Sequence, residues 1–379
     1  MSFEKKTLNL KGDTPGSTTE FTCYRIGPSE APDKIYLQAA LHADELPGVM
    51  VLHHLIPMLA EADEQGLLRA RFTIVPLANP FGMANFSFRH HIGRYDANTG
   101  VNFNRQWPDL FTLIRTHLAG RLGDEARFNI NLVRKAISGW LDLQQPRTAA
   151  EQLRLFLLRE AHDAAIILDL HCDSDSLPHF FTSPELMPGL QDLADWMGAS
   201  AVLTAADSGG GSFDEVLPLL YRKVAQSNPG KPVPMATASA TLEYRGLADV
   251  HDEFGEQDAL RLFGFFAGRG WIAADPGPKP EANCAPIPFE ATEIVRASGP
   301  GIVAFRTDLG QRVRTGQPIA DLIALDGPHA FVGRTPILAG TDGFVLSRTL
   351  SKYVTRGANV AKIVGTTPLP QRKGYLLED

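Results

Sequence analysis

The chain has 379 residues, with 36 Lys and Arg against 43 Asp and Glu and a formal net charge of −7 at pH 7. This acidic balance argues against nucleic acid as the main partner, and the lack of any run of 18 uncharged apolar residues argues against a membrane span. The first residues lack the apolar run of a secretory signal, and the three cysteines are too far apart to suggest a disulfide framework. We therefore expect a cytoplasmic protein with two domains.

The stretch 34–48, KIYLQAALHADELPG, combines a predicted strand with two candidate metal ligands. The apolar run 35–41 is typical of a buried strand, and it ends just before His42 and Glu45. An imidazole and a carboxylate three residues apart can bind the same metal ion. Apolar residues at helical spacing then predict a helix over 46–62.

The next predicted strand, 72–78, leads into an Asn-Pro turn signal and a long polar loop that extends to Pro108. Long polar loops that also contain aromatic residues are typical of functional sites. Arginine binds carboxylates in a bidentate manner, and an arginine near a metal can stabilise an oxyanion. The candidate residues of this loop are Arg89, Arg94, Asn104 and Arg105.

The region 109–162 is predicted to be a helical insertion that shapes the wall of a pocket. It is followed by a strand-like run, 164–170, which ends at His171. Asp173 or Asp175 is expected to orient the His171 ring by a hydrogen bond, as carboxylates often do behind metal-binding histidines.

A third strand-like run, 236–242, ends at Glu243. Each reactive residue thus follows a predicted strand, and ligands bind at the carboxyl ends of strands in open α/β sheets. Two histidines and one glutamate are the ligand set of a catalytic zinc site, with the fourth position open for water, and we expect one Zn2+ per chain. Glu243 then remains as a carboxylate that can move protons. The expected metal ligands are His42, Glu45 and His171.

Five prolines between Pro276 and Pro288 indicate a linker. We expect a hydrolase domain over 1–284 and a small all-β domain over 285–379, where short β-like runs alternate with glycine turns. The second domain resembles a biotinyl/lipoyl-like barrel without an evident modified lysine. We interpret it as a lid or as a surface for assembly into a homo-oligomer.

The order of the motifs resembles the zinc carboxypeptidase superfamily and, within it, the succinylglutamate desuccinylase/aspartoacylase family. The motifs are His42-x-x-Glu45, Asn79-Pro80-Phe81, Arg89, Asn104-Arg105 with Pro108, Asp169-Leu170-His171, and Glu243. The resemblance implies an α/β fold, namely a three-layer α/β/α domain with a mixed sheet. It also implies zinc bound by His42, Glu45 and His171. It implies Glu243 as general base and acid, Arg89 (or alternatively Arg94) polarising the carbonyl, and Asn104 and Arg105 holding a substrate carboxylate.

The predicted function is zinc-dependent hydrolysis of the amide bond in a small N-acyl amino acid. A metallocarboxypeptidase that acts on small peptides is the alternative among enzymes, because it would bind the same carboxylate. The alternative from another class is a catalytically silent metal-binding scaffold. The expected partner is a small carboxylate substrate, without nucleic acid or membrane.

Overall fold

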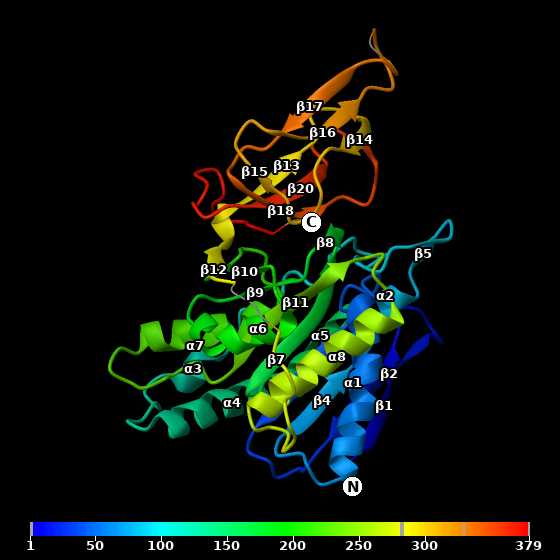
Figure 1. The fold of residues 1–379 in the computed structure, drawn as a ribbon. Coiled ribbons are helices and arrows are strands. Elements are labelled where there is room, and N and C mark those ends of the chain that lie inside the picture. Colours follow the sequence, from blue (N-terminus) through cyan, green and yellow to red (C-terminus); the bar gives the residue numbers. More distant parts are fainter. Residues whose placement is uncertain (1–2, 281–283, 329, 378–379) are drawn as a thin grey trace.

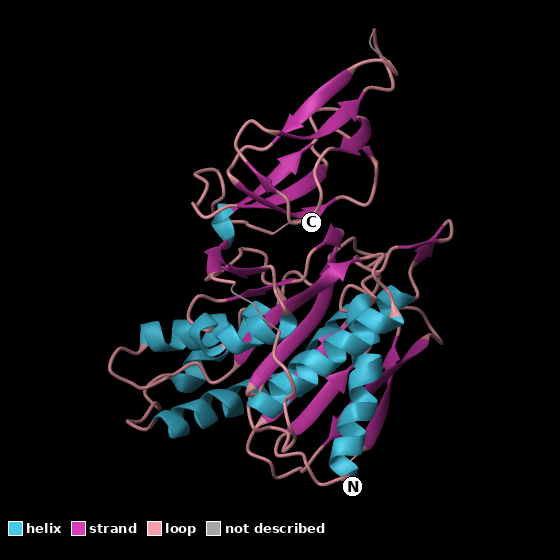
Figure 2. Cartoon of the chain, in the orientation of Figure 1, coloured by secondary structure: helices cyan, strands magenta, loops and turns pink. Residues whose placement is uncertain are grey.

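A large mixed sheet forms the centre of the computed structural model, which describes residues 3–280, 284–328 and 330–377 (Figures 1 and 2). Its strands in spatial order are β1 (Glu4–Lys11), β2 (Thr18–Ile26), β4 (Arg71–Val75), β3 (Lys34–Ala39), β7 (Ile166–Asp173), β11 (Ala238–Gly246), β9 (His179–Thr182), β10 (Ala201–Thr204) and β12 (Pro286–Pro288). Strands β4, β3, β7 and β11 run parallel to one another. Their carboxyl ends therefore meet at one edge of the sheet.

Helices cover both faces of this sheet, so the parallel strands are buried on both sides. In β3, Ile35 and Leu37 pack into the core on one face, while Tyr36 between them packs into the core on the other. The helices of the first face are α1 (Pro47–Glu64), α6 (Gln191–Met197) and α8 (Asp252–Gly268), and those of the second are α3 (Leu110–Leu118), α4 (Ala126–Asp142), α5 (Ala149–Ala161) and α7 (Val216–Ser227). The predicted α/β/α layering is confirmed.

The predicted helical insertion over 109–162 contains α3, α4 and α5, which supply most of one face. Shorter elements connect the layers: α2 (Pro80–Met83), β5 (Phe86–Ser87), β6 (His90–His91), β8 (Asp175–Ser176), and the 3-10 turns η1 (Met187–Gly189), η2 (Phe213–Glu215) and η3 (Phe289–Ala291). Among the described residues, none of the helices has the length and apolar character needed to cross a membrane.

The chain beyond residue 284 is rich in strands, as expected. Strand β12 joins the large sheet beside β10, and the later strands form smaller antiparallel sheets around an apolar core of their own (Figure 1). One sheet contains β13 (Thr292–Arg296), β20 (Asn359–Val364), β18 (Gly343–Arg348) and β15 (Arg312–Val313), and the other contains β17 (Arg334–Leu338), β16 (Pro318–Ile323), β14 (Gly301–Phe305) and β19 (Tyr353–Val354). Residues 281–283 of the predicted linker lie outside the described residues, and the domain boundary at residue 284 remains a prediction.

The contact between α1 and β7 is unusually close at Gly48. A Cβ atom at this position would lie 2.7 Å from the Leu170 Cβ and 2.9 Å from the Leu170 carbonyl oxygen. Gly48 follows Glu45 in the chain and Leu170 precedes His171, so this contact sets the distance between the segments that carry two predicted metal ligands.

We expect Gly48→Ala to lower the free energy of unfolding by about 1–3 kcal/mol, because the added methyl group meets backbone that cannot move without displacing β7. Urea unfolding followed by circular dichroism measures the change. Gly139→Ala is the matched control, since nothing lies within 4 Å of its added Cβ atom in the exposed part of α4. The control should raise stability by up to about 1 kcal/mol, as alanine favours helix. Equal stability of the two variants would contradict the packing argument.

Candidate metal centre and active site

Three neighbouring parallel strands bring the predicted site residues to one edge of the sheet. His42 follows the end of β3, His171 lies near the end of β7, and Glu243 lies near the end of β11. Glu243 is directly opposite His171 in the parallel register of β11 and β7. The strand ends therefore gather these side chains although more than 200 residues separate the first from the last.

The turn after β3 directs its two ligands into the protein. Ala40 has a φ of 55°, which ends the extended strand. The Asn79 side chain donates to the Leu41 carbonyl over 3.0 Å and so fixes the turn from the neighbouring strand connection. Glu45 then stands two residues before the start of α1, and its Oε1 lies 3.0 Å from His42 Nδ1.

The potential ligand atoms of this cluster converge on one point. His42 Nδ1 is 3.0 Å from Glu45 Oε1, and His171 Nδ1 is 2.7 Å from Glu45 Oε2. The chosen ligand atoms of the three residues all lie within 4.8 Å of one another, and each residue is at most 3 % exposed. Two imidazole nitrogens and a carboxylate oxygen at this separation are a donor set that fits a single metal ion.

The Nε2 atoms of His42 and His171 have hydrogen-bond partners, which leaves the Nδ1 atom of each ring available for a metal. Asn102 Oδ1 lies 2.8 Å from His42 Nε2 and also accepts from the Asn104 backbone N–H, which identifies it as an acceptor. Asp169 Oδ2 lies 3.1 Å from His171 Nε2. An acceptor at Nε2 holds the proton on that nitrogen and orients the ring.

The prediction that Asp173 or Asp175 orients His171 is wrong. These carboxylates instead bind Lys362 and Arg348, respectively, from the C-terminal sheets. Asp169 orients the His171 ring instead. Residues two apart on a strand point to the same side, so the Asp169 side chain lies beside the His171 ring. The Asp-x-His spacing in the sequence was the available signal.

The protonation of the cluster is shaped by burial and by its neighbours. Burial, together with the nearby Arg94 charge, lowers the pKa of His42 to about 4, which keeps the ring neutral as a metal ligand requires. Burial tends to raise the pKa of Glu45, but His42 and Arg94 outweigh it and hold that pKa well below its ordinary value. Glu45 is thus a buried anion.

Glu243 differs from the three converging residues because one of its carboxyl oxygens lacks a hydrogen-bond partner among the described residues. Its Oε2 is buried, and among the described residues it has no hydrogen-bond partner. Burial, reinforced by the negative charge of Glu45, raises the pKa of Glu243 to about 8. A carboxyl group with these properties beside a metal centre can take up and release a proton.

The two candidate arginines occupy very different places. Arg94 Nη2 lies 2.5 Å from Glu45 Oε1, and Nη1 lies 3.4 Å from His42 Nε2. Arg89 is exposed at the turn of the hairpin formed by β5 and β6, with a φ of 71°, and does not line the pocket. The hairpin itself projects from the body of the protein (Figure 1). The expectation that Arg89 lies at the site is therefore corrected: of the two arginines, the structure places Arg94 in the pocket lining. The linear spacing could not show that the residues between Asn85 and Ile92 fold into a projecting hairpin.

Asn104 and Arg105 both line the same pocket, as predicted from their motif. Asn104 accepts from the Phe213 backbone N–H over 2.9 Å, and Arg105 Nη1 donates to the Asn104 carbonyl over 2.9 Å. Arg154 of α5 donates to the Arg105 carbonyl over 3.0 Å, which gives the helical insertion a role in holding the loop. Arg105 also donates to the Tyr375 hydroxyl over 3.3 Å.

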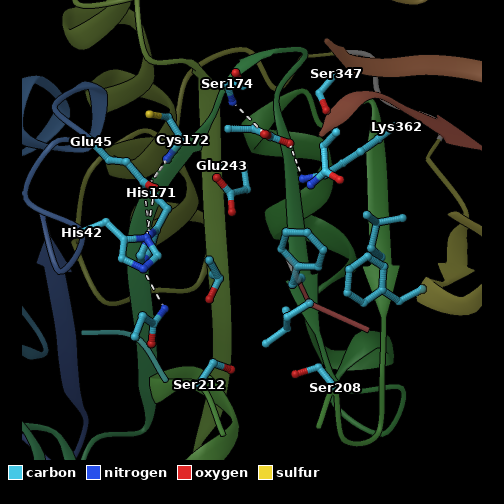
Figure 3. Close-up of a pocket in the computed structure, with 18 of the residues that line it drawn as sticks. His42, Glu45, His171, Cys172, Ser174, Ser208, Ser212, Glu243, Ser347 and Lys362 are labelled. Atoms are coloured by element: carbon cyan, nitrogen blue, oxygen red, sulfur yellow. Dashed lines mark hydrogen bonds and ion pairs between the residues drawn. The ribbon is translucent and has the colours of Figure 1, made fainter. Parts of the chain in front are cut away.

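The pocket has a volume of about 370 Å³ and extends from the metal centre to the C-terminal sheets (Figure 3). The lining that the sequence did not predict includes nine residues from beyond residue 284: Phe289, Ser347, Arg348, Thr349, Asn359, Val360, Ala361, Lys362 and Leu377. These residues reach the pocket because β18 pairs with β8, immediately after β7. Such pairing between distant segments leaves no local sequence signal.

Residues 31–210 match a family model described as the succinylglutamate desuccinylase/aspartoacylase catalytic domain. The chain is therefore similar to that catalytic domain over this stretch, which is slightly less than half of its length. The resemblance predicted from the motifs is confirmed, and succinylglutamate desuccinylase/aspartoacylase proteins form a family of deacylase enzymes. The curated protein sequences contain no match to the chain.

Solved structures of the desuccinylase/aspartoacylase type share the fold over nearly the whole chain. A protein of Shewanella frigidimarina NCIMB 400 is 21% identical with a TM-score of 0.82, over 96% of this chain and 97% of that one. A family protein of Shewanella amazonensis SB2B is 24% identical with a TM-score of 0.80, over 95% and 98%. The ectoine utilization protein EutE (DoeB) of Ruegeria pomeroyi is 18% identical with a TM-score of 0.66, over 96% and 95%. At these identities the structures establish the fold alone.

We expect the purified protein to hold one metal ion per chain and His171→Ala to lose it, because that change removes one of three converging ligand atoms. Elemental analysis after dialysis measures the content. His54→Ala is the matched control, since His54 lies on α1 and contacts Asp252 outside the pocket. Full metal content in the His171 variant would show that the ligand set is wrong.

Proposed function

We propose that this protein is a zinc-dependent amidohydrolase that removes the acyl group from a small N-acyl amino acid. The observation that carries the proposal is one pocket that combines three converging metal-ligand atoms with the unpartnered carboxyl of Glu243. The ligand set suits zinc, which when bound would act as a Lewis acid toward the carbonyl and increase the acidity of a water.

Glu243 is the residue proposed to move protons. Its carboxylate accepts a proton from the attacking water and returns it to the nitrogen of the departing amine, as general acid–base catalysis requires. The absence of a hydrogen-bond partner for Oε2 among the described residues supports this role, since a group committed to a structural bond could not exchange its proton freely.

The arginines are proposed to act on different parts of the substrate. Arg94 stands beside Glu45 and provides positive charge where the carbonyl oxygen becomes negative during attack. Arg105, with Asn104, binds the substrate carboxylate at a separate part of the pocket wall. One fixed carboxylate and one polarised carbonyl together orient a small N-acyl amino acid.

The two alternatives receive less support. A peptide substrate of a metallocarboxypeptidase needs an open groove, whereas Lys362 and Ser347 from the C-terminal sheets line the same pocket as Glu243 (Figure 3). A metal-binding scaffold needs neither a pocket of about 370 Å³ beside its metal nor an unpartnered carboxyl within it.

We expect Glu243→Gln to keep its zinc and its fold while turnover of the best N-acyl amino acid falls roughly 10²–10⁴-fold, the effect of losing a positioned general base. This corresponds to about 3–5 kcal/mol of activation free energy. Glu293→Gln is the matched control, because Glu293 in β13 is a partly buried glutamate with a raised pKa that lies outside the pocket. Loss of zinc would make Glu243 a ligand, and full activity would place the base elsewhere.

A paired comparison of Arg94→Ala and Arg89→Ala tests which arginine assists the carbonyl. We expect Arg94→Ala to reduce kcat by about 10²–10³-fold, as removal of one oxyanion-stabilising group does. Arg89→Ala should leave kcat unchanged, because Arg89 is exposed on its hairpin. Zinc content is measured for both, since Arg94 also contacts Glu45. The reverse pattern of activities would return the role to Arg89.

A further inference from the structure

The two ends of the pocket carry different side chains. In Figure 3, Ser208 and Ser212 lie at the lower end, whereas Lys362 and Ser347 lie with Glu243 in the upper part. Arg105 belongs to the lower end, because the backbone N–H of the next residue, Gln106, donates to the Gly210 carbonyl between the two serines. A substrate whose carboxylate meets Arg105 and whose amide lies beside Glu243 therefore directs its acyl group toward Lys362.

The acyl side of the pocket is built by the C-terminal sheets. Ser347 and Arg348 of β18 pair with Ser176 and Asp175 of β8, just beyond the end of β7. This pairing holds β20, the neighbour of β18, over the pocket and presents Lys362 to it. The C-terminal sheets thus form a wall of the same pocket as the metal centre.

Lys362 enters this wall as one half of a tight ion pair. Its Nζ lies 2.7 Å from Asp173 Oδ2, and the two side chains are only 15% and 13% exposed. The carboxylate of Asp173 therefore offsets the charge of Lys362 within the wall.

The same arrangement occurs at the second cation of this wall. Arg348 binds Asp175 Oδ2 through Nε at 3.2 Å and through Nη2 at 3.0 Å. Among the described residues, the two cationic side chains that the C-terminal strands bring to the pocket, Lys362 and Arg348, thus each have an aspartate partner from the segment after His171. A ligand carboxylate arriving here would meet aspartate oxygens as well as the cations.

The neighbouring wall offers apolar side chains. Phe181 of β9 lies beside Thr241 of β11, and its ring centroid is 5.0 Å from that of Phe289. Leu203 of the adjacent β10 lines the pocket with them. Apolar and charge-balanced walls favour an uncharged group, since a buried charge without a partner is costly.

From this arrangement we infer that the acyl group removed by the enzyme is short and uncharged, as in an N-acetyl amino acid, and that the Asp173–Lys362 pair excludes acyl groups that end in a carboxylate. The inference rests on the proposed amidohydrolase function and specifies its substrate class. Asp173 acts as the excluding residue, because its carboxylate already pairs with Lys362, the cation that a terminal acyl carboxylate would need.

The wild-type protein gives the first test. The kcat/KM for N-acetyl and N-succinyl derivatives of the same amino acid is measured for a set of L-amino acids. We expect the acetyl compound to be preferred by at least about tenfold, or about 1.4 kcal/mol. Preference for the succinyl compound would overturn the inference while leaving the amidohydrolase proposal intact, whereas hydrolysis of neither series would overturn both.

Asp173→Asn tests the excluding residue, because it removes the competing carboxylate and leaves the Lys362 charge. The ratio of succinyl to acetyl kcat/KM should rise by about tenfold or more, since a charged hydrogen bond to the acyl carboxylate becomes available. Calorimetric titration of the metal-free variant with succinate should show tighter binding than in the wild type. Asp173→Asn/Lys362→Met should return both readouts toward the wild-type values.

Asp163→Asn is the matched control, because Asp163 Oδ1 also binds a lysine, Lys34, at 2.7 Å and lies outside the pocket. It should leave the succinyl-to-acetyl ratio unchanged. A folded Asp173→Asn variant with the wild-type ratio and wild-type succinate affinity would overturn the inference. If this variant does not fold, the substrate preference of the wild-type protein still decides it.

Discussion

The buried carboxylate of Glu45 is the constraint on which the site depends. It is 2 % exposed and lies within 3.0 Å of both His42 Nδ1 and His171 Nδ1, with Arg94 as its cationic partner. A buried anion is costly unless it is paired or bound to a metal. The burial of Glu45 therefore explains why a loop arginine turns inward and why two histidines from different strands face one carboxylate. A cation at their centre would complete the balance of charge.

The need to surround the Glu45 carboxylate with partners also constrains the distance between α1 and β7. Glu45 stands just before α1, and its second oxygen accepts from the Cys172 backbone N–H over 3.2 Å. The helix can approach the strand this closely only because Gly48 lacks a side chain where Leu170 passes. The same close packing that completes the core thus places the carboxylate between the histidines. The stability of the fold and the geometry of the three converging side chains are therefore coupled at this contact.

The parts of the site that the sequence predicts are those governed by local pattern. Apolar runs that end in His42, His171 and Glu243 predict parallel strands, and the geometry of such sheets brings their ends together. The choice between Arg89 and Arg94 depends on a hairpin within a loop, where spacing carries no information about direction. Lys362 could not be found in this way, because its place depends on strand pairing between segments more than 150 residues apart. The layers of the fold can be predicted from the periodicity of apolar residues, whereas contacts between distant sheets cannot.

The residues that line the pocket come from two parts of the fold, the central strands and the C-terminal sheets. The groups proposed for chemistry stand on the ends of central strands, where the register of β7 and β11 holds Glu243 opposite His171. The cations on the acyl side come from sheets attached through the short pairing of β18 with β8. Substitutions in those outer sheets can alter the charge of this pocket wall without moving the converging side chains of His42, Glu45 and His171. The Asp173–Lys362 pair joins the two parts, since Asp173 lies two residues after His171 on β7. If the proposed function holds, substrate selectivity can therefore change at this pair while the three converging ligand atoms and Glu243 keep their geometry.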